Sequence, residues 1–278
     1  MAIPFSDRVY MVAEDSGSNV WVRDTGSAMW GVIYDPVNDY VIGTGGEGDR
    51  IFVLDAATGA VVSSTTPPDG GSYILPSNRM SDAGIWLVFE SGYGGTDEVV
   101  AVSRNGTQHW FKQSLGSVVM GAASTESGKH LVGLDNGTVI VWDNAGNQTA
   151  SFLATSPELA RFDADDNIIV VGNASGAVDA YDYSGSKVWA QDFSSLTVTS
   201  PVNPIVGPYG DVYAAAESDG TNGHSSAVRL DKSDGSIVWS SGGILTDASG
   251  FAIALDVRSS DGKITAFTSG TIQYGAQS

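Results

Sequence analysis

The chain has 278 residues, 42% of them hydrophobic, and carries 32 acidic and 13 basic side chains, for a net charge of −19. This balance disfavours duplex nucleic acid as a partner, because no basic stripe is available to displace phosphate counterions. Cysteine is absent, which excludes disulfides, thiolate nucleophiles and cysteine-based metal sites.

The N-terminal region predicts two strands, over residues 8–14 and 19–24. Residues 1–17 lack the basic segment and the apolar core of a secretory signal. No apolar run in the sequence approaches the ~20 residues that a membrane helix needs. We therefore expect no membrane insertion, and a location in the cytoplasm or in a virion.

From residue 29 onward one pattern recurs: an alternating strand, a polar turn of the form Asp-x-x-x-Gly, and a second strand that often contains Trp. The turn glycines are Gly59, Gly106, Gly146, Gly185 and Gly235, spaced 39 to 50 residues apart. In the turn of Gly106, Ser103 replaces the aspartate. Self-similarity at this period, carried by short strands, is typical of radial all-β arrays.

Each repeat divides into four predicted strands. They cover residues 29–35, 39–45, 50–56 and 60–66; 73–83, 85–91, 98–104 and 107–113; 117–124, 130–134, 138–142 and 148–154; 158–164, 167–173, 177–183 and 187–193; 203–210, 211–217, 226–232 and 236–242. The last stretch, 251–275, supplies only three strands. A missing fourth strand would leave an exposed sheet edge, and the N-terminal strands can fill that position.

We therefore predict one all-β domain over residues 1–278, a single β-propeller of six four-stranded blades that an N-terminal strand closes. The alternative is seven blades, because Asp24-Thr25-Gly26 followed by Trp30 repeats the hairpin phrase. Six blades are favoured, since only about ten residues separate Trp30 from the next predicted second strand, too few for two further strands.

Tryptophan recurs at a fixed place in the repeat. Trp30, Trp110, Trp189 and Trp239 each lie four residues after a turn glycine. A repeated position of this kind predicts a shared packing slot between blades rather than a ligand contact.

The phrase A-x-D-x-x-T-G-x-x-x-W resembles the repeat of the PQQ-like (quinoprotein-like) β-propellers, whose tryptophan-docking motif has this spacing. The turn from Asp55 to Gly59 is the fullest match, and the turn from Asp231 to Gly235 with Trp239 matches both parts. VIVWDNAG, at 139–146, also resembles the Trp-Asp end of a WD40 unit. The resemblance implies a propeller. It does not imply quinone chemistry, because this chain lacks the adjacent cysteines with which quinoprotein dehydrogenases hold their cofactor.

Residue types that carry chemistry are sparse. His109, His130 and His224 form no His-x-His or His-x3-His pair of the kind that binds zinc. No serine lies in a Gly-x-Ser-x-Gly nucleophile motif. The run 163–167, DADDN, fits a turn between strands better than a calcium loop, although a weak cation site at high salt stays open. We therefore expect no enzymatic activity and no cofactor.

In a four-stranded blade, the connections after the second and fourth strands share one face. The longest predicted connections are all of this kind, at 45–49, 66–73, 91–97, 194–203 and 218–226. Long loops are often functional, so we predict a binding face there. Its candidate residues are Pro67, Tyr73, Glu90, Tyr93, Glu98 and His224.

Together these features predict a non-catalytic interaction or structural module. The acidic composition is typical of proteins adapted to high salt, such as those of a halophilic archaeon or its virus, because salt screens self-repulsion. A capsid decoration or tail component of a virion is one concrete form, with other proteins as partners. The alternative is a propeller that binds or cleaves glycans through the predicted binding face.

Overall fold

Strands are the only regular elements in the described part of the computed structural model. The structure describes every residue except 1, 6, 14–15, 17, 27, 46–49, 67–73, 78, 91–96, 156–161, 174–175, 194–197, 208–209, 219–223, 241–244, 247–251, 258–263, 269–270 and 276–278. Within that described part, no helix has the length and apolar character required to cross a lipid bilayer.

The chain divides into two compact units. The first contains Met1–Val132 and Ile140–Thr149, and the second contains Gly133–Val139 and Ala150–Ser278. The boundary passes through one sheet, whose four strands lie within residues 119–153 and are hydrogen-bonded in chain order. The chain therefore passes from one unit to the other inside a repeat rather than through a linker.

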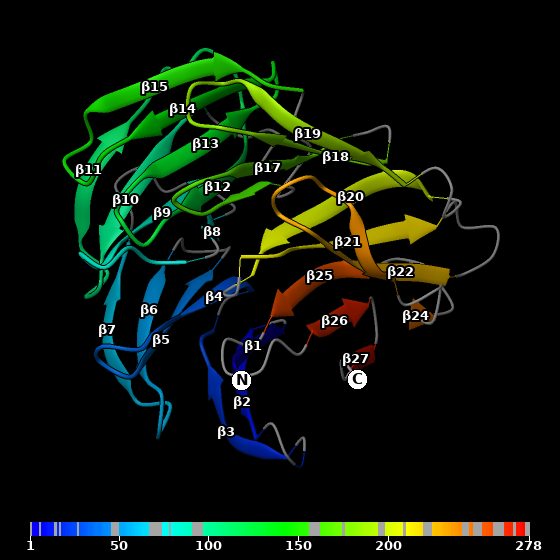
Figure 1. Ribbon diagram of the computed structural model, residues 1–278. Coiled ribbons are helices and arrows are strands. Elements are labelled where there is room, and N and C mark those ends of the chain that lie inside the picture. Colours follow the sequence, from blue (N-terminus) through cyan, green and yellow to red (C-terminus); the bar gives the residue numbers. More distant parts are fainter. Residues whose placement is uncertain are drawn as a thin grey trace. The chain divides into compact units, whose positions relative to one another are not determined.

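The first unit is built from meanders, sheets whose neighbouring strands follow one another in the chain (Figure 1). Its strands are β1 (Ala2–Phe5), β2 (Arg8–Val12), β3 (Asn19–Asp24), β4 (Met29–Asp35), β5 (Tyr40–Gly45), β6 (Ile51–Asp55), β7 (Val61–Thr65), β8 (Ile74–Pro76), β9 (Ile85–Glu90), β10 (Val99–Ser103), β11 (Gln108–Lys112), β12 (Val119–Ser124), β13 (His130–Leu134) and β14 (Thr138–Trp142). They form the sheets β1–β3, β4–β7 and β8–β11, and β12–β14 are the first three strands of the sheet that the unit boundary divides. Residues 133–134 of β13 and 138–139 of β14 belong to the second unit.

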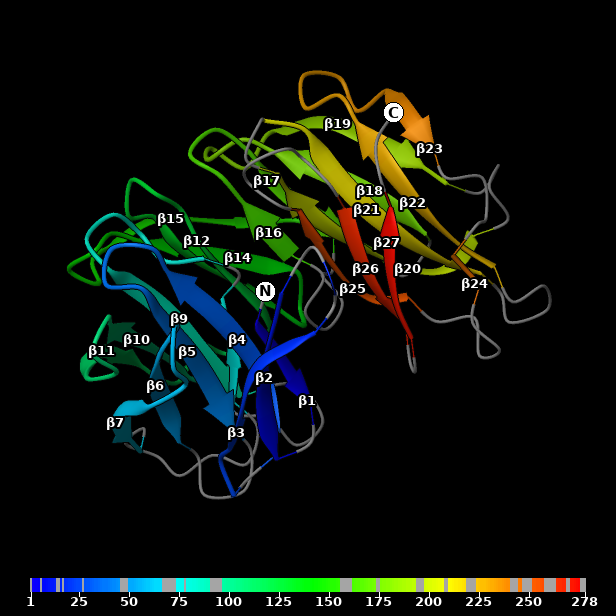
Figure 2. The ribbon, with the colours of Figure 1, turned by 90° about the horizontal axis from the view of Figure 1, so that it is seen from below.

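The second unit continues the same antiparallel pattern (Figure 2). Its strands are β15 (Gln148–Leu153), β16 (Phe162–Ala164), β17 (Ile169–Gly172), β18 (Ala177–Tyr181), β19 (Lys187–Asp192), β20 (Val198–Val206), β21 (Val212–Ser218), β22 (His224–Leu230), β23 (Ile237–Ser240), β24 (Leu245–Thr246), β25 (Ala252–Val257), β26 (Ile264–Thr268) and β27 (Thr271–Gly275). The sheets are β16–β19, β20–β23 with β24 paired to β22, and β25–β27.

The predicted all-β architecture is confirmed, and the number of sheets is consistent with six blades. Within the described residues, five sheets contain at least four strands, and the remaining strands form a three-stranded sheet at each end of the chain. The structure places Trp30 in β4, the first strand of its sheet, so the seven-blade interpretation of that tryptophan is wrong. Closure by an N-terminal strand stays a prediction, because the two terminal sheets belong to different units.

Two predicted connections are shorter than expected. Residues 194–203 were expected to be a loop, but β20 already begins at Val198. His224 was expected in a loop, but it is the first residue of β22 and pairs with Thr246 of β24, a strand that the sequence pattern did not predict. The physical reason is the same in both cases: additional backbone pairing extends the strands into segments whose polar composition is typical of loops.

Apolar side chains from neighbouring sheets form the cores. In the first unit, one cluster joins β4–β6 to β9 and β10 and is centred on Trp86, which is fully buried. In the second unit, a cluster joins β17–β19 to β20–β22 around Trp189 and Phe193. Both clusters lie between two sheets, so each sheet is held by its neighbours in the chain.

Candidate functional site

The aspartate that recurs in the repeat holds its own turn together. Asp55, Asp143, Asp182 and Asp231 each accept hydrogen bonds at Oδ1 from backbone N–H groups two to four residues on, at 2.8–2.9 Å. Side-chain hydrogen bonds from Thr58, Asn147, Ser184 and Ser233, together with these backbone donors, lower the pKa of the four carboxyl groups. The repeated aspartate is therefore explained by turn formation.

The glycine of the same turn receives an aromatic side chain from the preceding sheet. The pairs are Trp21 with Gly59, Trp110 with Gly146, Phe152 with Gly185, and Trp189 with Gly235. In each pair a Cβ added to the glycine would lie 2.5–3.0 Å from the nearest atom of the aromatic side chain. Each of these glycines also has a positive φ, so both the backbone and the packing favour glycine there.

The indole N–H groups complete these contacts. Trp21 Nε1 donates to Ala56 O at 2.8 Å, Trp110 Nε1 to Asn144 O at 3.2 Å, and Trp189 Nε1 to Lys232 O at 2.7 Å. The predicted shared packing slot is thus confirmed for Trp110 and Trp189. Trp30 lies outside it, and Trp239 is 39% exposed.

One junction, between β4–β7 and β8–β11, lacks the aromatic ring. Here Thr65 Oγ1 donates to Gly106 O at 2.6 Å and Ser63 Oγ donates to Asn105 O at 3.0 Å. Two hydroxyl groups thus replace the indole N–H, but they do not replace the volume of the ring. We call this the open junction, and we call the contact of Trp110 with Gly146 the filled junction.

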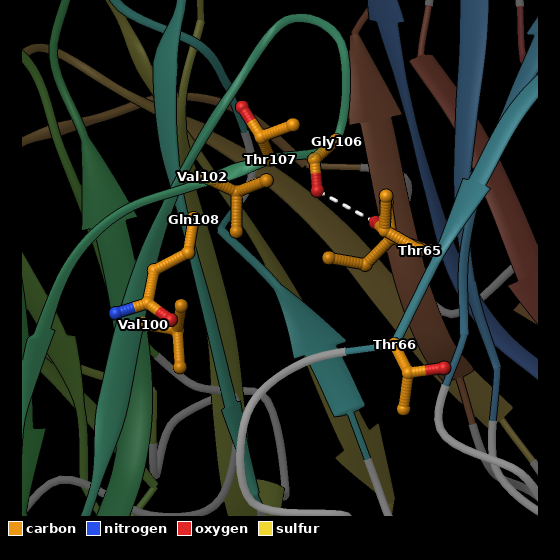
Figure 3. Close-up of a pocket in the computed structure, with 8 residues that line it drawn as sticks. Thr65, Thr66, Val100, Val102, Gly106, Thr107 and Gln108 are labelled. Atoms are coloured by element: carbon orange, nitrogen blue, oxygen red, sulfur yellow. Dashed lines mark hydrogen bonds between the residues drawn. The ribbon is translucent and has the colours of Figure 1, made fainter.

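A pocket of about 290 Å³ lies at the open junction. Figure 3 shows Val100, Val102 and Gln108 on one side of it and Thr65 and Thr66 on the other. The lining residues are Ile51, Thr65, Thr66, Val100, Val102, Gly106, Thr107 and Gln108, and none of them is charged.

A buried polar network lies beside the filled junction. Ser124 Oγ lies 3.0 Å from His130 Nδ1, and His130 Nε2 lies 3.0 Å from Asn144 Oδ1, which also accepts from Ser81 Oγ at 3.3 Å. Because Asn144 Oδ1 can only accept, Nε2 carries the proton and Nδ1 accepts from Ser124. Burial, followed by the nearby His109, lowers the pKa of His130 and keeps it neutral.

Ser124, His130 and Asn144 are linked in the same order as the nucleophile, base and orienting residue of a catalytic triad. The likeness goes no further than this order. Ser124 and His130 are both fully buried, and the Ser124 hydroxyl faces Ser77 Oγ at 3.2 Å. No surface on which a substrate could lie is present at this hydroxyl. The network instead connects the segment after β8, strands β12 and β13, and the β14–β15 turn.

Of the residues predicted for the binding face, Pro67, Tyr73 and Tyr93 lie outside the described residues. Glu90 ends β9 and His224 begins β22, and Glu98 is half-buried immediately before β10. The predicted binding face therefore stays a prediction, because half of its candidate residues lie outside the described part of the chain. In the described part of the chain, no group of three or more His, Asp or Glu is placed to hold a metal ion.

Several residues that matter at the junctions were missed in the sequence. Phe152 lies six rather than four residues after its turn glycine, and Trp21 follows Gly17, which is not part of an Asp-x-x-x-Gly turn. Ser63, by contrast, lies four residues after Gly59, where other repeats carry Trp. Ala150, four residues after Gly146, is small as well, so this offset alone marks two candidate junctions, of which Phe152 fills one.

An exposed apolar run lies on the outer strand β23. Ile237, Val238 and Trp239 are consecutive and are 39%, 51% and 39% exposed. β23 is the last strand in the order β20-β21-β22-β23. In register, Trp239 pairs with Arg229 just before a bulge, as Trp110 and Trp189 do with their partners, yet those two are only 9% and 7% exposed.

Solved structures with the same fold share little sequence with this chain. BamB from Moraxella catarrhalis is 15% identical with a TM-score of 0.59, the two matching over 98% of this chain and 88% of that one. The WD40 β-propeller domain of Doa1 is 14% identical with a TM-score of 0.71, over 98% and 87%. A chain of the Mitotic Checkpoint Complex is 13% identical with a TM-score of 0.74, over 98% and 82%.

No curated protein matches the sequence. One family model does, PQQ_2, described as "Outer membrane protein assembly factor BamB", in two overlapping matches at residues 95–242 and 135–272. These matches cover more than half of the chain and extend over the repeats that contain Trp110, Trp189 and Trp239. The chain therefore belongs to the PQQ_2 family of BamB-like β-propeller proteins.

Proposed function

We propose that this chain is a non-catalytic propeller that binds other proteins, and that β23 contributes the central contact. The observation that carries the proposal is the exposed run Ile237–Val238–Trp239. Runs of exposed apolar residues on edge strands are normally avoided, because they promote pairing with another chain. A tryptophan that is buried at equivalent positions in the same protein, but exposed here, is suited to be covered by a partner.

The similar proteins support protein partners rather than chemistry. The family description names an assembly factor, and one of the similar solved chains belongs to a checkpoint complex. The described polar residues at the junctions form hydrogen bonds within their turns or within the buried network of His130. Nothing in this arrangement supplies a nucleophile with access to a substrate, which favours binding over catalysis.

The net charge of −19 supports a high-salt setting. At ~1 M salt the Debye length falls to ~3 Å, so ionic contacts at a protein surface are largely screened while apolar contacts are retained. An apolar strand on an acidic protein is thus suited to association in brine. A capsid decoration or tail component of a halophilic virus is the concrete form of this proposal.

The salt proposal is tested by thermal unfolding from 0.1 to ~2 M KCl. Screening of self-repulsion should raise the melting temperature steeply over this range. A flat profile would contradict adaptation to high salt and leave the protein-binding proposal to be judged on its own experiment.

The binding proposal is tested by isolating the protein from its native source at high salt and measuring the mass of the assembly that contains it. We expect a complex or a particle, and the double variant Val238→Ser/Trp239→Ser should weaken re-association by more than tenfold. Leu153→Ser is the matched control, because Leu153 is an isolated exposed apolar residue on another outer strand.

Other outcomes contradict the proposal in distinguishable ways. A double variant that loses folding stability but keeps its association would show that the chain covers β23 itself. If Tyr73→Ala/Tyr93→Ala abolishes association while the β23 variant does not, the partner binds the predicted loop face. Saturable binding of oligosaccharides that depends on Tyr73 and Tyr93 would instead support the glycan alternative.

A further inference from the structure

Four outer strands in the described part of the chain carry a tryptophan in a shared slot, and β7 carries a serine there. We define the slot as the position on the outer strand that pairs with the neighbouring strand at the last residue before the register shift between the two strands. Trp21, Trp110, Trp189 and Trp239 occupy it in β3, β11, β19 and β23. In β7 the same register position, opposite Val53, is Ser63.

No other side chain of β7 compensates for the missing ring. In β15, the residue six positions after the turn glycine is Phe152, which packs against Gly185. The corresponding residue of β7 is Thr65, and a Cβ added to Gly106 would lie 3.2 Å from Thr65 Oγ1 and 3.5 Å from Ile51 Cγ2. Gly106 is therefore less tightly covered than the four turn glycines that face aromatic side chains.

A pocket lies beside this slot: Gly106 and Thr65 line it, whereas Ser63 does not. Its volume of about 290 Å³ exceeds the ~150 Å³ of an apolar cavity known to admit benzene. Ile51, Val100 and Val102 contribute apolar side chains to the buried wall of the pocket, and Gln108 contributes an amide group to its lining. We propose that this pocket binds a neutral planar aromatic compound of indole size.

The chemistry of the lining supports this choice of ligand. The four equivalent contacts show that this junction geometry accepts indole and phenyl rings against the turn glycine. The polar groups of the lining, from Thr65, Thr107 and Gln108, can serve a ligand that carries one N–H donor. The lining residues carry no charge, which disfavours carboxylate or ammonium groups on the part of the ligand that enters.

The experiment is a titration of the full chain, carrying isotope-labelled methyl groups, with indole and, separately, with N-acetyltryptophanamide. We expect saturable shifts of the Ile51, Val100 and Val102 methyl signals with a Kd below about 1 mM for indole. Tighter binding of the amide would identify the source of the ring as a tryptophan side chain of another protein. Tighter binding of free indole would identify a small aromatic compound. Shifts that do not saturate with either probe would overturn the proposal.

Ser63→Trp tests whether the slot itself is the site. Its indole should lie against Gly106, which lines the pocket, as Trp110 lies against Gly146 and Trp189 against Gly235. The affinity for indole should therefore fall by more than tenfold, and the melting temperature should rise. Ser64→Trp is the matched control, because Ser64 is the exposed neighbour on the same strand. Unchanged indole binding by a folded Ser63→Trp variant would overturn the proposal, and so would equal loss of binding in both variants.

Discussion

The filled and open junctions are built on the same turn and differ in what lies against it. Gly106 N donates to Ser103 O and Gly146 N to Asp143 O, both at 2.9 Å, and both glycines have φ near +80°. One turn receives the Trp110 indole, whereas the other receives the hydroxyl groups of β7. The comparison teaches that the turn forms from its own residues, so the ring can be lost without loss of the hairpin.

Deleting residues 2–24 should have the largest effect on the first unit, because it removes a whole sheet together with the contact of Trp21 with Gly59. Val9 is fully buried in the cluster with Met29, Val41 and Phe52, and Trp21 covers Gly59. We expect aggregation and loss of a cooperative thermal transition. Val20→Ser, at an exposed position of β3, should leave the transition unchanged. A soluble deletion variant of wild-type stability would show that β1–β3 are an appendage.

Trp110→Ala should be the most damaging single substitution at the filled junction. Its ring packs against Trp142 and His130, with centroids 5.7 and 6.0 Å away. Truncating a buried tryptophan typically costs about 3–5 kcal/mol. Ser63→Ala at the open junction removes one hydrogen bond and should cost only about 1 kcal/mol. Urea unfolding at fixed salt measures both, and equal losses would mean that the two junctions do not differ in packing.

Gly146→Ala and Gly106→Ala form a matched pair with a smaller expected difference. Both place a Cβ at positive φ, which costs about 1–2 kcal/mol. At Gly146 the new Cβ would also meet Trp110 Cγ at 3.0 Å, whereas at Gly106 the nearest atom is Thr65 Oγ1 at 3.2 Å. We expect Gly146→Ala to lose about 1 kcal/mol more in the free energy of unfolding. The reverse order would contradict the description of the open junction.

The smallest expected effect is the dependence of the unfolding free energy on pH, and it comes from His130 beside the filled junction. Burial lowers the pKa of His130 in the folded state, so below pH 6.5 the unfolded state binds more protons and stability falls as the pH falls. One proton contributes at most about 1.4 kcal/mol per pH unit. His130→Gln should flatten the dependence of unfolding free energy on pH between 7.5 and 5.5. An unchanged slope would show that His130 does not titrate with unfolding.

Much of the strand pattern could be predicted because it depends on local rules. The sequence predicts β13 and β14 with the bounds that the structure shows. Each is a short apolar segment with a turn that contains glycine on either side. His224 was misplaced because its strand is extended by pairing with Thr246, which no local pattern indicates.

The sites were harder to predict than the strands. The network of His130 joins Ser81, Ser124 and Asn144, which no sequence spacing brings together. In the sequence, Asn144 is one of several polar residues of a turn, and nothing distinguishes it from its neighbours. In the structure its side chain forms a hydrogen bond with the buried His130, and its carbonyl oxygen accepts from Trp110 Nε1. The open junction has Ser63 where the register places Trp110 and Trp189 in other sheets. This difference is recognised only when positions of the same register are compared between sheets.

An ion pair crosses the open junction and constrains how this chain can evolve. Arg104, in the β10–β11 turn, pairs with Asp35 at the end of β4 and also donates from Nη2 to Asp82 O at 2.9 Å. Asp35 is fully buried, so a chain that lost the arginine would retain an unpaired buried carboxylate. Lysine cannot replace the two-pronged guanidinium. Arg104 and Asp35 should therefore covary among related sequences, both being kept or both being lost.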